Sequence, residues 1–484
     1  MTAVVVGLAV LVAAPAARAD EPTPDVMRLM SDYARNSGYP GLAVAVTKGD
    51  RLLYSGGYGH DSTGAAVSAT TPMPVASVSK SFTALAVLQL VEAGRVQLDA
   101  PVRQYLPEFR LADARGDRIT VRELLNQTSG ITDQTLREKS LPQPSSLAEA
   151  VRRARQATLA TEPGTRHAYT NTNYHLAGRL VEVVAGIPFA DYLRDNIFRP
   201  LGMRDTLSID QTPRDLPDQV HQGHIYAYGA SVARTEPTRF VGGSDGVITT
   251  AADMARWLTM QSSGGTAGDG TRVISAQSLA AMHKSSDPRW TYGMGWEQDD
   301  DGRVRHNGVW FTYTASQLLL PSGYGIAVLG NSGIGLGNES TDRLADALAQ
   351  LITGGTPGVF APVRLIVDIV VAAVTLASVA LGIRALRRSR TRARAWSGKP
   401  LWLTAVRLLP RLLPLAVLAI LPRLLGAVFG GGRDLTFEQL AYYSFPLVVC
   451  VTVVAVANVG VLAARLVMLV RFHRAATVRT SPAG

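Results

Sequence analysis

Two residues in the first quarter of the chain could act together as a nucleophile and its proton acceptor. Ser77 and Lys80 are three positions apart, at the head of an apolar stretch that predicts a helix over 82–91. Residues three apart lie on one face of a helix, about 5–6 Å apart at Cβ. A serine hydroxyl beside an amine that can take its proton is a workable nucleophile. A serine near a helix start followed by a solvated lysine would look the same, so further residues must decide.

A second candidate pair is Tyr169 and Asn171, between a turn at 162–164 and a helix predicted over 172–185. A phenol at a loop-to-helix corner can enter a cleft and pass a proton. The Asn171 amide can serve a substrate carbonyl. The alternative is a tyrosine packed under a loop, with Asn171 helping the next helix to start.

A third candidate is His306-Asn307-Gly308, at the end of a predicted strand. A glycine there permits a close approach of another backbone, so a substrate could pair along this edge. His221 and Gly223 have the same spacing, but their surroundings are rich in proline and glycine. We interpret that second instance as a surface or cleft-rim segment.

The elements that must position these residues read as one α+β domain. A short helix (25–36) precedes two strands (42–46 and 51–54), with a tight hairpin turn at Gly49-Asp50. Helices are predicted over 119–130, 147–159, 172–185 and from Thr250, and a last helix over 342–351. Late strands are predicted over 292–296, 303–306, 315–320 and 325–329. Pairing the first hairpin with these late strands would bring the residues near 77 and 306 together.

Taken in order, the motifs Ser77-x-x-Lys80, Tyr169-x-Asn171 and His306-x-Gly308 resemble those of serine β-lactamase and penicillin-binding-protein-like hydrolases. The closer resemblance is to the branch of class C β-lactamases, D-alanyl-D-alanine carboxypeptidases, D-aminopeptidases and related esterases. It covers about residues 25–352, with supporting stretches at 123–130, 169–176 and 242–246. It implies a β-lactamase/transpeptidase-like α+β fold, with an antiparallel sheet flanked by helices and a helical lobe.

The resemblance also implies roles for individual residues. Ser77 would be the acylated nucleophile, and Lys80 and Tyr169 would share the proton, either of them being the formal base. The oxyanion hole would combine the backbone N–H groups of Ser77 and Val309. The substrate-binding residues would be Asn171, His306, Gly308 and Val309. The family chemistry uses no metal and no organic cofactor.

One departure from the family pattern bears on the substrate. Many relatives have Lys-Thr-Gly where this chain has His306-Asn307-Gly308. Lysine is a permanent cation suited to a substrate carboxylate, whereas histidine with an ordinary pKa is mostly neutral at pH 7. We therefore expect a substrate without a free carboxylate at that position. The bulky segment that follows, with Trp310, Phe311 and Tyr313, either narrows the site or packs against the sheet.

Charge is distributed unevenly along the 484 residues. Up to Gly355 there are 32 Lys and Arg against 35 Asp and Glu; beyond it there are 16 against 3. The basic quarter is mostly apolar and its charges flank hydrophobic runs, which indicates a membrane and gives no argument for nucleic acid. After a linker (353–361), the region 362–484 has apolar runs long enough to cross a bilayer.

The expected spans are roughly 362–384, 403–429 and 443–465. The middle run contains arginines and prolines, so it could instead lie on the membrane surface as a basic amphipathic helix. Three crossings put the basic loop 384–399 and the C-terminal tail on the cytoplasmic side, which satisfies the positive-inside tendency. This appended region resembles that of prodrug-activating peptidases of nonribosomal peptide pathways, the group that includes the colibactin-maturation peptidase.

The N-terminus predicts export. Residues 3–14 are almost wholly apolar, and Ala17-Arg18-Ala19 has the form of a signal-peptidase site, so we expect a signal peptide over 1–19. No Lys or Arg precedes the apolar run, which leaves an uncleaved anchor as the alternative. The only cysteine is Cys450, so the predicted domain over 20–352 can form no disulfide and no cysteine-based metal site.

These observations predict an extracytoplasmic, membrane-anchored serine hydrolase whose partners are a small substrate and the lipid bilayer. The first expectation is a peptidase or amidase that acts on D-amino-acid or acylated peptides, and an esterase is the alternative within the family. An alternative from another class is a non-catalytic penicillin-recognising sensor. The presence of Ser77, Lys80 and Tyr169 together favours an enzyme, because a pure binder does not need all three.

Overall fold

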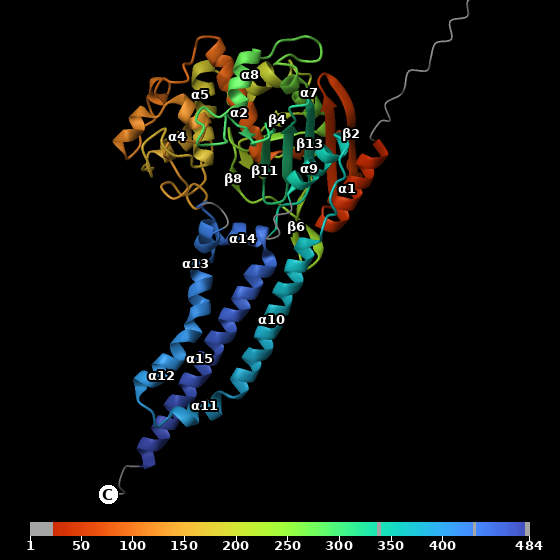
Figure 1. The fold of residues 1–484 in the computed structure, drawn as a ribbon. Helices are drawn as coiled ribbons and strands as arrows, with labels where there is room; N and C mark the ends of the chain where they lie inside the picture. The colour runs from red at the N-terminus through yellow and green to blue at the C-terminus, as the bar shows by residue number, and fades with distance from the viewer. Residues whose placement is uncertain (1–22, 336–339, 429–431, 480–484) are drawn as a thin grey trace, which may run out of the picture.

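The computed structural model describes residues 23–335, 340–428 and 432–479. The predicted signal peptide lies outside these residues. Figure 1 shows a domain of sheet and helices that rests on a bundle of three long helices. The domain runs from helix α1 (Thr23–Ser37) to helix α9 (Thr341–Ile352), and the bundle begins with α10 (Val363–Arg387).

A six-stranded antiparallel sheet with the order β10-β11-β12-β13-β1-β2 forms one layer of the domain. The predicted closure is confirmed: β1 pairs with β13, so that Val44 lies opposite Val328. The first hairpin turns at Gly49, whose φ of +57° favours glycine. The strands are β1 (Gly41–Lys48), β2 (Arg51–Gly59), β10 (Glu297–Gln298), β11 (Val304–Val309), β12 (Thr314–Leu319) and β13 (Tyr324–Gly330).

The sheet is covered on both faces, because alternate residues of β1 enter different cores. Ala43 and Ala45 belong to the large core between the sheet and the helical part of the domain. Val44 and Val46 belong to a second core, built with α1 and α9. Side chains alternate across a strand, so a central strand between two layers is apolar along its whole length.

The strand predicted over 292–296 is wrong. Tyr292 makes only an isolated bridge to Glu297, and the edge strand β10 is limited to Glu297–Gln298. Gly295 explains the difference. It has a φ of +73°, and a Cβ there would lie 2.6 Å from the carbonyl oxygen of Lys80. The segment 292–296 therefore packs closely against the helix that begins at Ser79 and does not form a regular strand.

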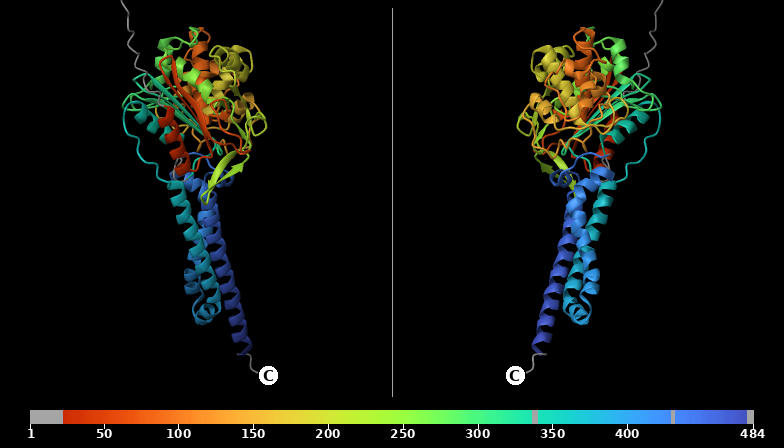
Figure 2. Two further views of the ribbon diagram at one scale, coloured as in Figure 1. Left: turned by 90° about the vertical axis from the view of Figure 1, so that its right-hand side faces the viewer. Right: turned by 90° about the vertical axis from the view of Figure 1, so that its left-hand side faces the viewer.

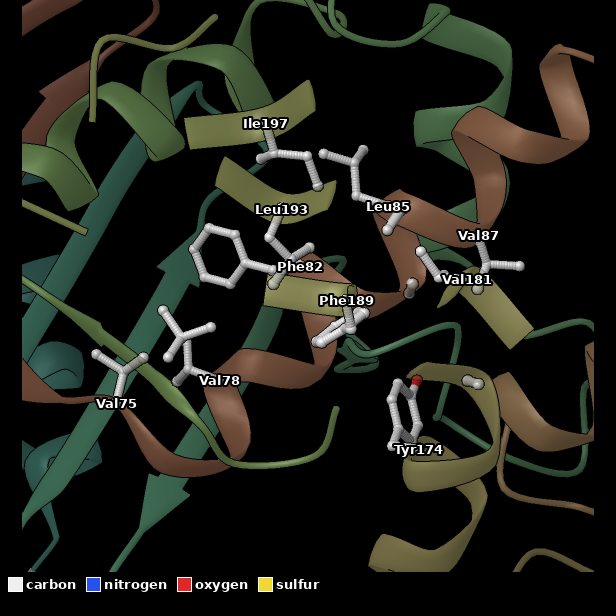
Figure 3. Close-up of a cluster of buried hydrophobic side chains, with 14 of the residues drawn as sticks. Val75, Val78, Phe82, Leu85, Val87, Tyr174, Val181, Phe189, Leu193 and Ile197 are labelled. Carbon is white, nitrogen blue, oxygen red and sulfur yellow. The ribbon is translucent and has the colours of Figure 1, made fainter. Parts of the chain in front are cut away.

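That helix, α2 (Ser79–Glu92), is the centre of the large core. Over 82–91 it is apolar on nearly all sides, as the sequence predicts for a buried helix, and other helices surround it. Figure 3 shows Phe82 and Leu85 of α2 facing Leu193 and Ile197 of the next layer. The Phe82 ring stacks on Trp257 with 4.0 Å between centroids.

The helical part of the domain is held by caps that the sequence predicts. Thr120 forms a full capping box at the start of α3 (Val121–Leu125), and the Thr250 hydroxyl accepts from the backbone N–H of Asp253. Gly186 ends α5 in the left-handed conformation. The other helices here are α4 (Leu147–Ala154), α5 (Asn171–Ala185), α6 (Phe189–Leu193), α7 (Ala251–Ser262) and α8 (Ala276–His283); α3 and α4 end several residues before the predicted bounds.

The C-terminal region contains three helical runs that are long and apolar enough to cross a membrane, over Val363–Arg387, Trp402–Val428 and Phe445–His473. The middle run consists of α12 (Leu401–Leu408), η5 (Leu409–Leu412) and α13 (Leu413–Val428), and it packs along α15 (Phe445–Arg479). Figure 2 shows the bundle extending away from the domain. Large aliphatic side chains such as Leu376 and Leu381 are 70% and 65% exposed on its surface, as lipid contact requires.

Candidate active site

Ser77 stands where a short strand joins the buried helix α2. Strand β3 (Met73–Pro74) pairs with β9 (Val247–Thr249), and a 3-10 turn, η1 (Ala76–Val78), leads into α2. Ala76 has a φ of +47°, in the left-handed region where residues with a Cβ are uncommon. Strained residues of this kind cluster at active sites, where the surroundings hold them in place. Between Met73 and Leu88, Ser77 is the one residue that is not buried.

Lys80 lies one turn later, and its side chain is wholly buried. Its Nζ donates hydrogen bonds to Ser77 Oγ (2.9 Å), to the Ser244 carbonyl oxygen (3.1 Å) and to Asp245 Oδ1 (3.1 Å). The spacing of the sequence motif thus brings nucleophile and amine into direct contact. Three donated hydrogen bonds use the full donor capacity of an ammonium group, so Lys80 is arranged here as a cation.

A further group at the site, not predicted from the sequence, is the carboxylate of Asp245. Ser77 Oγ donates to Asp245 Oδ1 at 2.7 Å, so the carboxylate contacts both the nucleophile and Lys80. Asp245 is 2% exposed and lies just before β9, the strand that pairs with β3. The available signal was a single acidic residue in the glycine-rich stretch 242–246, which was noted only for its family resemblance.

Charge compensation keeps Asp245 ionised. Burial alone would raise its pKa, but Lys80, Arg239 and the hydrogen bonds from Ser77 and Lys80 together hold that pKa well below its usual range. Arg239 Nη1 lies 3.7 Å from Asp245 Oδ2. A carboxylate with two cationic neighbours is a stable acceptor for the serine hydroxyl.

Tyr169 is half-buried, and its ring lies beside two cations. Lys80 Nζ is 5.0 Å from the ring centre, and the guanidinium carbon of Arg433 is 5.1 Å from it. Among the described residues, no hydrogen bond joins the Tyr169 hydroxyl to Ser77 or Lys80. The structure therefore brings Tyr169 to the site by ring packing, without the direct proton path that a shared-proton role needs.

Asn171 is the first residue of α5 and is 6% exposed. Its Nδ2 donates to Asp245 Oδ2 at 2.8 Å, which orients the carboxylate. Its Oδ1 is buried without a hydrogen-bond partner among the described residues. The predicted substrate-binding amide therefore belongs to the same hydrogen-bonded group as Ser77, Lys80 and Asp245.

His306 lies on β11 and is buried. Its Nδ1 is 2.6 Å from the Asn307 carbonyl oxygen, which can only accept, so Nδ1 carries the proton and Nε2 accepts from the Tyr292 hydroxyl at 2.9 Å. Burial, with the nearby Lys80 charge, lowers the pKa of His306 to about 4. The imidazole is thus neutral at pH 7, more firmly than an ordinary histidine would be.

Gly308 explains how β11 approaches the nucleophile. A Cβ on Gly308 would lie 2.0 Å from the Val75 carbonyl oxygen and 3.1 Å from Ala76 Cβ, in the segment that carries Ser77. Only glycine allows this contact. Val309, the next residue, is half-buried at the end of β11 and pairs with Thr314.

The bulky segment after Val309 packs inside the protein. Trp310, Phe311 and Tyr313 are at most 5% exposed. The Trp310 indole N–H donates to the Asp245 carbonyl oxygen at 3.1 Å and so helps to hold the backbone of Asp245 in place. Of the two interpretations left open by the sequence, packing against the sheet is the one observed.

The connection between α13 and α15 reaches the domain beside Tyr169. Arg433 Nε donates to Asp133 Oδ2 at 2.6 Å, and Asp133 is 3% exposed. Further along, α14 (Phe437–Tyr443) packs on Phe311, with ring centroids 4.9 Å apart for Tyr443. The helix bundle therefore contributes side chains to the surroundings of the site.

The second histidine motif of the sequence lies apart from Ser77, Lys80 and Asp245. His221 is in a loop, as predicted, and its Nδ1 is 2.6 Å from Asp61 Oδ2. Among residues 23–335, 340–428 and 432–479, no group of three or more His, Cys, Asp and Glu side chains is placed to hold a metal ion.

Comparison with known proteins agrees with this geometry. The family model described as Beta-lactamase matches residues 26–351. "Penicillin-binding protein 4" of Amycolatopsis lactamdurans is 34% identical over 346 residues, which cover 67% of this chain and 88% of that protein. The chain belongs to the beta-lactamase family of serine hydrolases.

Two solved structures show the same fold at low identity. The D-amino acid amidase of Ochrobactrum anthropi SV3 has a TM-score of 0.57 and 23% identity, covering 69% of this chain and 98% of that one. EstCE1, described as a hydrolase with promiscuous acyltransferase activity, has a TM-score of 0.54 and 20% identity, covering 65% and 94%. These two likenesses concern the fold, since fold alone does not fix a substrate.

Proposed function

We propose that this family member is a membrane-anchored peptidase or amidase that forms an acyl-enzyme on Ser77. One observation carries the proposal: the Ser77 hydroxyl, reachable from outside, is hydrogen bonded at once to Lys80 Nζ and to Asp245 Oδ1. A hydroxyl that donates to a carboxylate and accepts from an ammonium group is oriented for attack through its oxygen.

In the proposed acylation, Ser77 Oγ attacks the carbonyl carbon of the substrate while its proton enters the hydrogen-bonded group of Lys80 and Asp245, which passes a proton on to the leaving group. Lys80 donates to the same oxygen and stabilises the charge that develops on it. The backbone N–H groups of Ser77 and Val309 would receive the carbonyl oxygen. When the intermediate collapses, the C–N or C–O bond breaks, the leaving group takes a proton, and the acyl group stays on Ser77. Water then releases the acid and restores the hydroxyl.

The contacts of Lys80, Asp245 and Tyr169 support different roles for these three residues in proton transfer. Asp245 orients the Ser77 hydroxyl by accepting its hydrogen bond, and its lowered pKa makes it a weak base, so the proton must pass on through Lys80. We propose that Tyr169, whose ring centre lies 5.0 Å from Lys80 Nζ, carries a proton from Lys80 to the leaving group. Asn171 would align the substrate after release from Asp245.

The proposed substrate is a neutral amide at the position next to β11. His306 is buried and neutral, so this strand offers no permanent cation to a substrate carboxylate. The fold likeness to a D-amino acid amidase supports amides of D-residues as the first class to test. Greater activity on a free D-alanyl-D-alanine terminus than on N-acyl-D-amino-acid amides would contradict this substrate class.

An esterase is the second candidate within the family, supported by the likeness to EstCE1. A penicillin-recognising sensor is the candidate outside enzymes, and an acyl-enzyme that forms but is not hydrolysed would favour it. One set of substrates distinguishes the amidase, the esterase and the sensor: N-acyl-D-amino-acid amides, short-chain nitrophenyl esters and a chromogenic cephalosporin.

The decisive experiment is intact-mass detection of a fluorophosphonate adduct on the purified full-length protein. We expect one adduct on the wild type and none on Ser77→Ala. Ser77→Ala removes the nucleophile but no buried charge, so it should remain folded. An unmodified wild type would refute the acyl-enzyme proposal.

We further propose that residues 20–352 form the exported hydrolase domain, 353–361 the linker and 362–484 the membrane region. Three long apolar helices and the basic segment at the end far from the domain support this arrangement. The C-terminal tail would then be cytoplasmic. A membrane-impermeant lysine reagent tests the orientation: Lys48 should react in intact cells and Lys399 only after lysis.

A further inference from the structure

Arginines gather around two adjoining cavities at the end of the helix bundle farthest from the hydrolase domain, where Figures 1 and 2 show the turn around α11 (Ser389–Trp396). The cavities have volumes of about 400 and 840 Å³ and share four lining residues: Arg392, Arg411, Asn458 and Arg465. The smaller cavity is also lined by Arg384 and Arg388. Ligand sites in proteins typically occupy about 300–1,000 Å³, so both cavities are large enough for one.

Arg465 is the buried member of this group. It lies on α15, is 4% exposed, and lines both cavities. Among the described residues it has no hydrogen bond and no ion pair, and its Nε is buried without an acceptor. Its guanidinium carbon is 5.4 Å from the centre of the Trp396 ring, which holds the side chain in place. A buried donor without an acceptor is costly, so the position calls for an anion.

The chain cannot supply that anion from nearby. No Asp or Glu occurs in 369–433 or in 439–484. Asn458, which also lines both cavities, is already bound to another arginine: its Oδ1 accepts from Arg411 Nη1 at 2.9 Å. A general excess of arginine at one membrane side explains exposed arginines, but it does not explain one that is packed inside the bundle.

We propose that Arg384, Arg388, Arg392, Arg411 and Arg465 form a binding site for a phosphate group. Guanidinium groups match phosphate oxygens with paired hydrogen bonds, and several of them converge here from different helices. At the edge of a bilayer the phosphate is that of an anionic phospholipid headgroup, and a soluble phosphate is the other possible source. The inference rests on the proposed insertion of the bundle in a membrane, but not on the hydrolase activity.

The bound phosphate would connect the helices of the bundle to one another. Arg384 lies on α10, Arg392 on α11, Arg411 on η5 and Arg465 on α15, so a phosphate bound among them would join different helices of the bundle.

The test is native mass spectrometry of the full-length protein in detergent, titrated with phosphatidylglycerol or phosphatidylcholine. We expect the wild type to retain phosphatidylglycerol in preference to phosphatidylcholine. Arg465→Gln should weaken that retention by about tenfold or more, because a charge-assisted hydrogen bond is lost. Arg471→Gln is the matched control: it makes the same change on the same helix, at an exposed position outside both cavities.

A second arm distinguishes the source of the phosphate. If inorganic pyrophosphate displaces phosphatidylglycerol from the wild type, the site is a general phosphate site; if it does not, the lipid headgroup is the ligand. A thermal unfolding midpoint close to that of the wild type shows that each variant is folded. If Arg465→Gln does not fold, Arg411→Gln takes its place. Equal retention of the two lipids by the wild type, or equal phosphatidylglycerol retention by Arg465→Gln and the wild type, overturns the proposal.

Discussion

Replacing Asp245 by asparagine tests the central claim about the active site. The substitution keeps the size of the side chain and removes its charge. In the wild type the carboxylate accepts from Ser77 at 2.7 Å, from Lys80 at 3.1 Å and from Asn171 at 2.8 Å, and it is 2% exposed. The variant therefore leaves a buried Lys80 cation without its counter-charge.

Two magnitudes follow from this geometry. Removing one partner of a buried ion pair costs about 3–5 kcal/mol, and we expect the lower end because the asparagine oxygen can still accept one bond. For acylation, the serine hydroxyl loses a charge-assisted hydrogen bond of about 1.5–3 kcal/mol. If that bond helps the transition state, acylation slows by roughly ten- to a hundred-fold.

The assay is the rate of fluorophosphonate acylation by intact mass, measured beside the free energy of unfolding by denaturant. Asp253→Asn is the matched control, since Asp253 is also buried, at 1% exposed, but contacts Thr206 and Asp205 instead of the site. We expect that control to lose stability without losing acylation rate. An Asp245→Asn protein that is acylated as fast as the wild type would refute the role assigned to the carboxylate.

The pH dependence gives an independent check. The pKa of Asp245 is lower in the folded state, so its stabilising effect is fully present above the unfolded value of about 3.9 and is lost as the pH falls through the folded value. The difference in stability between wild type and Asp245→Asn should be constant from pH 8 to pH 5 and shrink only below about pH 4. A difference that disappears near pH 6 would contradict this assignment.

Three further predictions concern the surroundings of the site. The pKa of His306 is about 4 in the folded protein and about 6.5 in the unfolded chain, so the free energy of unfolding decreases as the pH falls between these values. In His306→Gln, the decrease between pH 7 and pH 5, measured by denaturant unfolding, should be smaller by about 2 kcal/mol. Arg433→Gln breaks the ion pair between the half-buried Arg433 of the bundle and the buried Asp133 of the domain, and should lower the free energy of unfolding by about 1.5–3 kcal/mol and slow acylation of Ser77. Unchanged acylation would show that the bundle does not act on the site. Gly308→Ala places a Cβ 2.0 Å from the Val75 carbonyl oxygen, so its acylation rate should fall more than about a hundred-fold, whereas Gly268→Ala, with open space around the new Cβ, should match the wild type in the same assay.

The bundle of three apolar helices contacts the domain close to the candidate site. Arg433 lies beside Tyr169, and Tyr443 packs on Phe311 close to the supporting face of the site. Anchoring alone would need no such contacts. Studies of substrate specificity should therefore use the full chain, because removing the bundle would also expose the charge of Asp133.

The local features of this protein follow from its sequence. Ser77 and Lys80 meet because residues three apart share a helix face, and α2 is buried because its stretch 82–91 is apolar on nearly every side. The hairpin at Gly49 and the three apolar helical runs were likewise predictable, because each depends on residues that are near one another in the chain. The strands predicted at the two ends of the domain also predicted that the first hairpin pairs with the late strands, as β1 does with β13.

Only the tertiary structure decided how distant residues complete the site. Asp245 is 168 positions from Ser77 and comes from a glycine-rich turn that has no periodicity to reveal its direction. Arg433, from the connection between α13 and α15, contacts Asp133 across 300 positions. The segment 292–296 has the composition of a strand, yet Gly295 packs it onto α2. These contacts depend on how the sheet and the helices pack against one another. The residue pattern within one segment does not show which other segment will pack against it.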